Sequence, residues 1–165
     1  VGSDATLCTR IPLISATLCV SLTTVSFHGE VTKPPARAAD AFPDNNGRFV
    51  VLFHSHPGEG DHFDLMIERG AALATWRVEA PPEACRERGA LDCLRLADHR
   101  ATYLEYEGPI SGNRGEVSRH DAGRFEILDQ SSGGFVIRLS GDRTVGVFVL
   151  EIVEGAASQW RLRLA

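Results

Sequence analysis

The sequence predicts a mainly β fold: a compact, closed or partly open β-barrel of about eight short strands with little helix. Runs rich in β-branched and aromatic residues recur from position 48 onward, and clusters of Gly, Ser, Pro and Asp separate them. No long stretch repeats its apolar residues with the 3.6-residue period of an amphipathic helix. Many short strands joined by tight turns are typical of a barrel or a sandwich.

Four strands are expected in the first half of this domain. Their residues are β-branched and aromatic or alternate between polar and apolar, and they span 48–53, 62–67, 74–78 and 91–96. Pro81 and Pro82 interrupt the series, because proline donates no ladder hydrogen bond. Together with the charged residues 83–89, they predict a loop or at most one helical turn.

Four more strands are expected in the second half. They span residues 125–128, 135–139, 144–153 and 160–164. Turn-forming clusters at 131–134 and 140–142 separate the first three of them.

Residues 1–46 differ in composition from the rest of the chain. The apolar run 11–22 is too short to cross a bilayer, and no convincing signal-peptide cleavage site follows it. We expect residues 1–46 to be a disordered or mis-annotated extension. Residues 47–165 are expected to form the barrel domain of a cytoplasmic protein with no membrane segment.

Charge and cysteine content restrict the classes of function. The formal net charge of −5 argues against a protein that holds duplex DNA on a broad basic surface. It permits a protein that grips one strand end with a few arginines and a metal. The four cysteines include no C-x-x-C pair, which favours reduced thiols in the cytosol over a zinc site or a disulfide framework.

Three histidines and an aspartate lie within eleven residues: His54, His56, His62 and Asp64. In a strand, residues i and i+2 point to one face, so His62 and Asp64 project together, as do His54 and His56. The Gly- and Pro-bearing residues 57–61 form a turn short enough to fold the two strands into a hairpin. One histidine of the first strand would then meet His62 and Asp64. The competing interpretation is a set of surface-loop histidines.

Two imidazoles and a carboxylate suit Mn²⁺, Zn²⁺ or Fe²⁺ and leave coordination positions open for water and phosphate oxygens. A second polar group lies at 98–108. His99 is a candidate general acid or phosphate ligand, because the unperturbed histidine pKa of about 6.5 permits either role. Tyr103 is a candidate hydrogen-bond donor to a phosphate oxygen. A solvated polar loop is the competing interpretation of this segment.

Taken in order, these segments resemble the 3′-phosphoesterase family of bacterial ligase D. That family carries an F-V-V-x-x-H strand, an L-H-Y-D-F-x-L-E strand, a Trp strand, a D-H-x-x-x-Y-x-x-F-E-G segment and an Asp-Gly hairpin. The matching positions are 49–54, 61–68, Trp76, 98–99 with Tyr103, 107–108, 121–123 and, in the last strand, Trp160. The resemblance implies a compact β-barrel that removes 3′-phosphates and 3′-terminal ribonucleotides from DNA, with Mn²⁺ held by two histidines and an aspartate.

The resemblance also implies the metal ligands, which are His62, Asp64 and either His54 or His56. Strand register favours His54, whereas the interval to His62 favours His56. We prefer His54, because register on a paired strand is harder to change than loop length.

For catalysis, the resemblance implies that His99 and Tyr103 contact the scissile phosphate. The family's arginine two residues after the metal aspartate is replaced here by Met66. Its lysine after the Trp strand and its N-terminal Arg-Asp arm have no counterpart. Each lost cation removes charge stabilisation commonly worth ~10²-fold or more in rate. Three arginines are expected to bind phosphate from other positions: Arg77, Arg100 and Arg114.

The sequence therefore predicts a monomeric, metal-dependent 3′-phosphoesterase that processes DNA 3′ termini in end-joining repair. Mn²⁺ is the expected cofactor, with Zn²⁺ or another divalent metal as the alternative. The expected partners are DNA 3′ ends and separate ligase or polymerase proteins, and the expected location is the cytoplasm, at the nucleoid.

Two other functions compete with this one. Met66 in place of arginine favours a catalytically degenerate module on the same barrel that binds DNA ends or a repair partner. The His54-Ser55-His56 run with Glu59 faintly resembles the first motif of cupins. A cupin-like enzyme would need His54 and His56 on one metal without Asp64.

Overall fold

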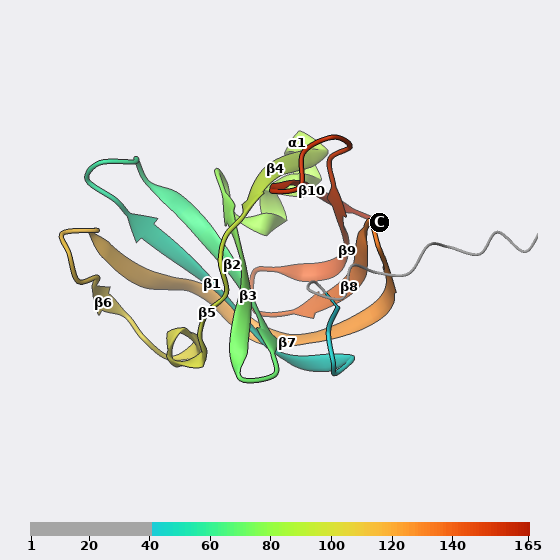
Figure 1. Ribbon diagram of the computed structural model, residues 1–165, viewed down its shortest axis with the longest axis horizontal. Coiled ribbons are helices and arrows are strands. Elements are labelled where there is room, and N and C mark those ends of the chain that lie inside the picture. The colour runs from blue at the N-terminus through green and yellow to red at the C-terminus, as the bar shows by residue number, and fades with distance from the viewer. Residues whose placement is uncertain (1–40) are drawn as a thin grey trace, which may run out of the picture. The chain divides into compact units, whose positions relative to one another are not determined.

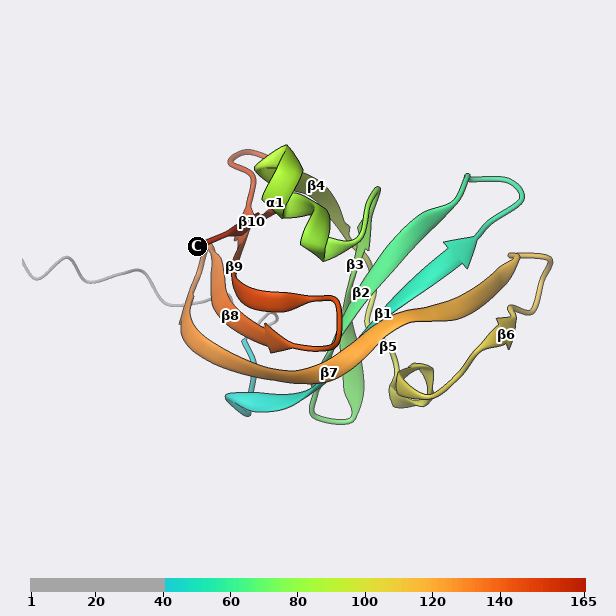
Figure 2. The same ribbon diagram turned by 180° about the vertical axis from the view of Figure 1, so that it is seen from behind.

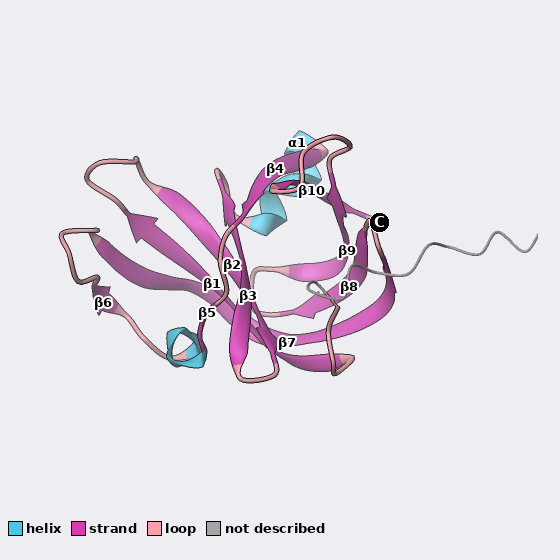
Figure 3. Ribbon diagram, in the orientation of Figure 1, coloured by secondary structure: helices cyan, strands magenta, loops and turns pink. Residues whose placement is uncertain are grey.

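The computed structural model describes residues 41–165, and in this part of the chain antiparallel strands close into an eight-stranded barrel (Figure 1). The strands follow the order β1-β2-β3-β4-β10-β9-β8-β7, and β7 pairs back onto β1 to complete the ring. Strands dominate and helix is scarce (Figure 3). The predicted fold class is thus confirmed, and the barrel is closed.

All the expected strands are present, and apart from β7 their ends lie within two residues of the predicted ones. The ring consists of β1 (Asn46–Ser55), β2 (His62–Arg69), β3 (Ala72–Val78), β4 (Ala90–Arg95), β7 (Glu116–Ser131), β8 (Gly134–Ser140), β9 (Val145–Ile152) and β10 (Gln159–Leu164). β7 starts well before the predicted residue 125. The sequence did not reveal this first half of the strand, because it is mostly polar, shows little apolar alternation and is defined by its pairing with β1.

The expected loop after β3 contains two short helical turns, a 3₁₀ turn over Pro82–Ala84 and α1 over Cys85–Arg88. Proline suits the first turn of a helix, where a backbone N–H has no intrahelical partner. Gly89 ends α1 with a φ of 78°, and its N–H donates to the Cys85 carbonyl. This segment is one turn longer than predicted.

The barrel interior is the main hydrophobic core. Trp76, Phe135 and Trp160 pack edge-to-face or tilted, with ring centroids 5.4 to 5.7 Å apart. Burying each such side chain contributes roughly 1.5–3 kcal/mol. Phe42 packs against Phe135 and is buried in the same core, although it falls within the segment assigned to the N-terminal extension.

A second, smaller apolar layer lies outside the barrel. Its members from the barrel wall are Val50, Leu52, Met66, Leu73 and Val117. The segment after β4 crosses this outer face as β5 (His99–Arg100), a 3₁₀ turn (Ala101–Leu104) and β6 (Gly108–Pro109), coloured yellow in Figures 1 and 2. Because β1 and β2 are covered on both faces, their sequences read as nearly continuous apolar runs.

The turn between β8 and β9 is fixed from β7 by the buried carboxylate of Asp121. It accepts the backbone N–H groups of Asp142, Arg143 and Thr144 at 3.0, 3.1 and 2.7 Å. Burial alone would raise the pKa of Asp121, but these donors outweigh it and the pKa lies below its usual value. A side chain at Gly141 would collide with this carboxylate, which explains the glycine there.

Cys85 and Cys93 are free and buried, and burial raises the pKa of their thiols to about 11 and about 12. Cys8 and Cys19 lie outside the described residues, as do residues 1–40 of the segment 1–46 that was predicted to be a disordered or mis-annotated extension. In residues 41–165 no helix has the length and apolar content needed to cross a membrane.

Candidate metal centre

His54, His62 and Asp64 are brought together by the pairing of β1 with β2. His54 is the direct partner of His62 across the antiparallel pair, and Asp64 pairs with Leu52. Directly opposed residues point to the same face of a sheet, as do residues two apart on one strand. All three side chains therefore project from the outer face of the barrel. One ligand atom from each lies within 4.8 Å of the others.

The imidazoles of His54 and His62 each form a hydrogen bond to a backbone carbonyl through one ring nitrogen. His54 Nε2 lies 2.7 Å from the Arg114 carbonyl oxygen, and His62 Nδ1 lies 2.9 Å from that of Gly60. A carbonyl only accepts, so these nitrogens carry the protons and donate. The opposite nitrogens, His54 Nδ1 and His62 Nε2, face Asp64 at 3.4 and 3.9 Å. Metal-ligating histidines are commonly oriented in this way, with the outer N–H donated to a carbonyl.

Asp64 is the least ordinary of the three residues. Its side chain is 5% exposed, and its Oδ1 has no hydrogen-bond partner. A buried carboxylate oxygen without a partner is costly unless a cation or a donor meets it. Interaction with Asp64 raises the pKa of His54, whereas burial lowers the pKa of His62. An unsatisfied carboxylate oxygen between two imidazole nitrogens fits a divalent cation such as Mn²⁺, Zn²⁺ or Fe²⁺.

His56, two residues after His54, makes different contacts from His54. Its Nδ1 accepts the backbone N–H groups of Gly58 and Glu59 at 3.2 and 3.0 Å, which stabilises the turn between β1 and β2. It lies outside the cluster formed with Asp64. His54 belongs to the cluster with His62 and Asp64, whereas His56 does not, although it lines the same cavity and its ring centroid lies 6.4 Å from that of His62. The cupin-like arrangement, which needs His54 and His56 on one metal without Asp64, does not match this geometry.

His54, His62 and Asp64 are called the metal cluster below. A cavity of about 230 Å³, the metal cavity, opens over these three residues, and both His99 and Tyr103 line it. Their rings lie 5.5 Å apart in an edge-to-face contact. His99 Nδ1 lies 2.9 Å from the Ala97 carbonyl and donates to it, so Nε2 is the nitrogen left for other contacts. The segment 98–108 thus contains short strands and a 3₁₀ turn; it is mostly exposed to solvent, and His99 and Tyr103 are the residues that it contributes to the cavity.

The position of His99 is fixed by its neighbour Asp98. Asp98 pairs with Arg69 of β2 and Arg95 of β4. These charged contacts hold the pKa of Asp98 below its usual value even though burial opposes its ionisation. The Arg95 guanidinium also lies 4.8 Å over the Trp76 ring, an arrangement that stabilises a cation.

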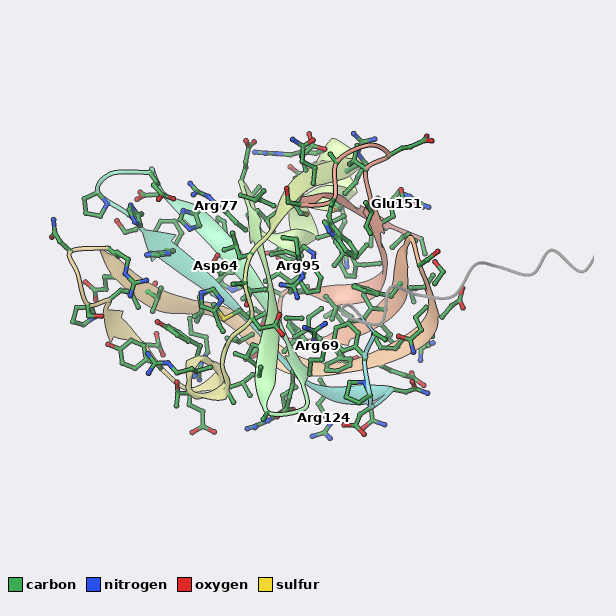
Figure 4. All side chains as sticks on the ribbon, viewed as in Figure 1. Asp64, Arg69, Arg77, Arg95, Arg124 and Glu151 are labelled. Carbon is green, nitrogen blue, oxygen red and sulfur yellow. The ribbon has the colours of Figure 1, made fainter. Side chains whose placement is uncertain are left out.

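The predicted phosphate-binding arginines do not all lie together. Arg77 and Arg114 line the cavity of the metal cluster, whereas Arg100 lines a neighbouring one. Arg77 is the direct partner of Asp64 in the β2–β3 pair and projects from the same face; both are labelled in Figure 4. Met66, which stands at the position of the family's arginine, is buried in the outer apolar layer.

Two residues contribute to this site that were not among its predicted residues; the sequence had indicated Glu59 only as part of the cupin-like motif. Glu59 Oε2 accepts from Arg77 at 2.6 Å, and the Glu59 carbonyl accepts from the same guanidinium at 2.9 Å. Gly115 has a φ of 84°, and a Cβ there would overlap the Ser55 carbonyl oxygen. This close approach brings the neighbouring Arg114 carbonyl to His54. The sequence signal for Gly115 is the glycine-rich run 112–115.

Comparison with known proteins agrees with the motif order. Residues 54–151 match the DNA ligase D 3′-phosphoesterase domain family, so the resemblance inferred from the motifs is confirmed. The chain is similar to the "Multifunctional non-homologous end joining protein LigD" of Mycolicibacterium smegmatis, at 26% identity over 157 residues, 85% of this chain and 20% of that protein. The protein of the same name from Mycobacterium bovis is 24% identical over 130 residues, 73% of this chain and 17% of its own length. The chain thus spans about a fifth of the length of these relatives.

Proposed function

Because the chain belongs to the DNA ligase D 3′-phosphoesterase domain family, we propose that it hydrolyses phosphoester bonds at DNA 3′ ends with a divalent cation held by His54, His62 and Asp64. The observation that carries this proposal is the buried Asp64 Oδ1, which has no partner and lies 3.9 Å from His62 Nε2. Mn²⁺ is the proposed metal, with Zn²⁺ as the alternative. The substrates are DNA ends carrying a 3′-phosphate or a 3′-terminal ribonucleotide, in the end-joining context that the relatives' names state.

When bound, the cation polarises a phosphoryl oxygen and lowers the pKa of a water molecule. His99 Nε2 is the group proposed to give a proton to the leaving oxygen, because its Nδ1 is committed to the Ala97 carbonyl. The Tyr103 hydroxyl donates to a non-bridging phosphate oxygen. Both side chains line the cavity over the metal cluster, which is consistent with these roles.

Arg77 is proposed to supply the positive charge that the family obtains from the arginine replaced here by Met66. It projects beside Asp64 from the neighbouring strand, and its charge acts on both His54 and His62. A guanidinium binds phosphate oxygens in a bidentate fashion. Glu59 holds the same guanidinium through two hydrogen bonds, so phosphate binding requires this contact to be exchanged.

The Glu59 contact also favours a second candidate function, a module that binds DNA 3′ ends without hydrolysing them. An arginine already engaged by a carboxylate stabilises a transition state less than a free one. Such a module would bind a 3′-phosphorylated oligonucleotide and leave it intact.

The test is phosphate release from a 3′-phosphorylated oligodeoxynucleotide with Mn²⁺ present. We expect inorganic phosphate and a 3′-hydroxyl end, and no release by the Asp64→Asn variant. Asp92→Asn, which removes an exposed carboxylate outside the cavity, is the matched control and should remain active. Binding without release by the wild-type protein would identify the second candidate function, and release by Asp64→Asn would exclude the proposed metal site as the catalytic centre.

A further inference from the structure

A second cavity, of about 270 Å³, lies next to the metal cavity and shares Tyr103 and Ile110 with it. Arg100, Thr102 and Tyr106 also line it. Most of its lining residues belong to the segment that carries β5, the following 3₁₀ turn and β6. Figure 2 shows the path of this segment. A ligand whose reacting group sits over the metal cluster would therefore extend past Tyr103 into the second cavity.

Aromatic rings lead from one cavity to the other. His99 contacts Tyr103, and Tyr103 contacts Tyr106 edge-to-face at 5.8 Å between ring centroids. Tyr106 is 39% exposed, and its hydroxyl donates to the Pro109 carbonyl at 2.6 Å, which fixes the ring. An exposed, immobilised aromatic ring is the surface on which nucleic-acid bases stack.

The charge of this cavity suits a phosphodiester. No acidic side chain is among its lining residues, and Arg100 forms no ion pair with any residue of the described range 41–165. The two glutamates of the same segment have other partners. Glu105 pairs with Arg48 at 3.4 Å, and Glu107 accepts the backbone N–H of Arg119 at 2.8 Å. A guanidinium that has no ion-pair partner within residues 41–165 and lies next to tyrosines combines the two elements of single-strand recognition.

We propose that the second cavity binds the nucleoside whose 3′ oxygen carries the reacting phosphate. Its base stacks on Tyr106, and Arg100 contacts the phosphodiester on the 5′ side of that nucleoside. This inference rests on the proposed function, because the reacting phosphate must occupy the metal cavity. The ligand class is a strand end that has at least one unpaired terminal base, since a base held in a duplex stack is not available to Tyr106.

The test compares two oligodeoxynucleotides with a 3′-phosphate, one with a normal terminal base and one with an abasic terminal nucleoside. KM is measured with Mn²⁺, and binding is measured separately by fluorescence anisotropy in EDTA, where no turnover occurs. Tyr106→Ala should weaken binding of the normal strand roughly tenfold, because stacking is worth ~1–3 kcal/mol per base. Tyr106→Phe keeps the ring but loses the hydrogen bond to the Pro109 carbonyl, so it should bind the normal strand more tightly than Tyr106→Ala and more weakly than the wild type. Neither variant should change binding of the abasic strand.

Arg100→Gln should weaken binding of both strands equally, and the loss should shrink as salt is raised. Arg143→Gln, at the exposed β8–β9 turn, is the charge-matched control and should bind like the wild type. Equal affinity of the wild-type protein for both strands, no effect of Tyr106→Ala, or no binding at all would overturn this inference. Base-dependent binding without hydrolysis would support the nucleoside site and reject the proposed phosphoesterase activity. Hydrolysis without base dependence would support the phosphoesterase activity and reject the nucleoside site.

Discussion

The guanidinium of Arg77 donates to both the side chain and the backbone carbonyl of Glu59, at 2.6 and 2.9 Å. Hydrogen bonding to Arg77 lowers the pKa of Glu59, so this carboxylate is ionised at neutral pH. Glu59 thus presents an anion to the arginine that we propose as the phosphate-binding residue. Glu59 and an incoming phosphate compete for the same donors.

Removing the charge of Glu59 should therefore strengthen phosphate binding. We expect Glu59→Gln to lower the inhibition constant of inorganic phosphate about two- to fivefold, a modest effect because the pair is exposed to solvent. Arg77→Gln should weaken inhibition by phosphate. Glu87→Gln, which removes an exposed glutamate of α1 outside the cavity, is the matched control. Unchanged inhibition in Glu59→Gln would show that the two anions do not share Arg77.

Gly115 is predicted to control metal affinity from outside the ligand set. Gly115→Ala places a methyl group against the Ser55 carbonyl and should displace Arg114, whose carbonyl orients His54. Loss of such an outer partner commonly costs 10–100-fold in metal affinity, so we expect a loss of about tenfold or more by Mn²⁺ titration.

Gly112→Ala is the control for backbone strain. Gly112 has a φ of 80° in the same loop, but a Cβ at this position would lie 3.9 Å from its nearest neighbour, Nε of Arg114. Both variants carry the same kind of backbone strain, but Gly115→Ala should lose more stability because of the added collision with the Ser55 carbonyl, and only Gly115→Ala should lose metal affinity. Equal Mn²⁺ affinities in the two variants would contradict the role given to Gly115.

Asp121 is predicted to make stability depend on pH. Its pKa is lowered on folding because three backbone N–H donors outweigh its burial, so its contribution is complete above the usual aspartate pKa of about 3.9 and disappears as pH falls through the lower folded value. Asp121→Asn should cost about 1.5–3 kcal/mol in urea unfolding at pH 7, and the difference from wild type should narrow below about pH 4. Asp142→Asn, on the exposed turn, should cost little. A pH-independent difference would contradict this account.

His99 is predicted to act on turnover and not on metal binding. His99→Gln should lower kcat by about 10²–10⁴-fold, the usual range for a general acid, while Mn²⁺ affinity stays at the wild-type value. A His99→Gln variant that loses metal affinity in parallel with kcat would indicate a structural role.

Much of the fold follows from local sequence patterns. Short β-branched runs and the turns between them predicted the barrel, because period-2 packing and turn chemistry are local properties. The first half of β7 was missed, since its residues are mostly polar and the strand exists through its pairing with β1. The outer apolar layer was also missed, because Val50 and Met66 look like ordinary members of core strands.

The candidate site was predictable where strand geometry decides it. Alternation placed His62 and Asp64 on one face, and pairing register then brought His54 to them. The contact between Glu59 and Arg77 depends on how a turn folds back over a neighbouring strand, which residue spacing does not determine. The separation of Arg100 from Arg77 and Arg114 likewise depends on the path of the covering segment.

The most direct test of the central claim is a Mn²⁺ titration followed by electron paramagnetic resonance, with the wild-type protein beside His54→Gln, His62→Gln, Asp64→Asn and His56→Gln. We expect one bound Mn²⁺ per wild-type chain, at least a tenfold loss of affinity in each of the first three variants, and wild-type affinity in His56→Gln. Wild-type affinity in Asp64→Asn, or a loss in His56→Gln as large as that in His54→Gln, would contradict the proposed metal centre.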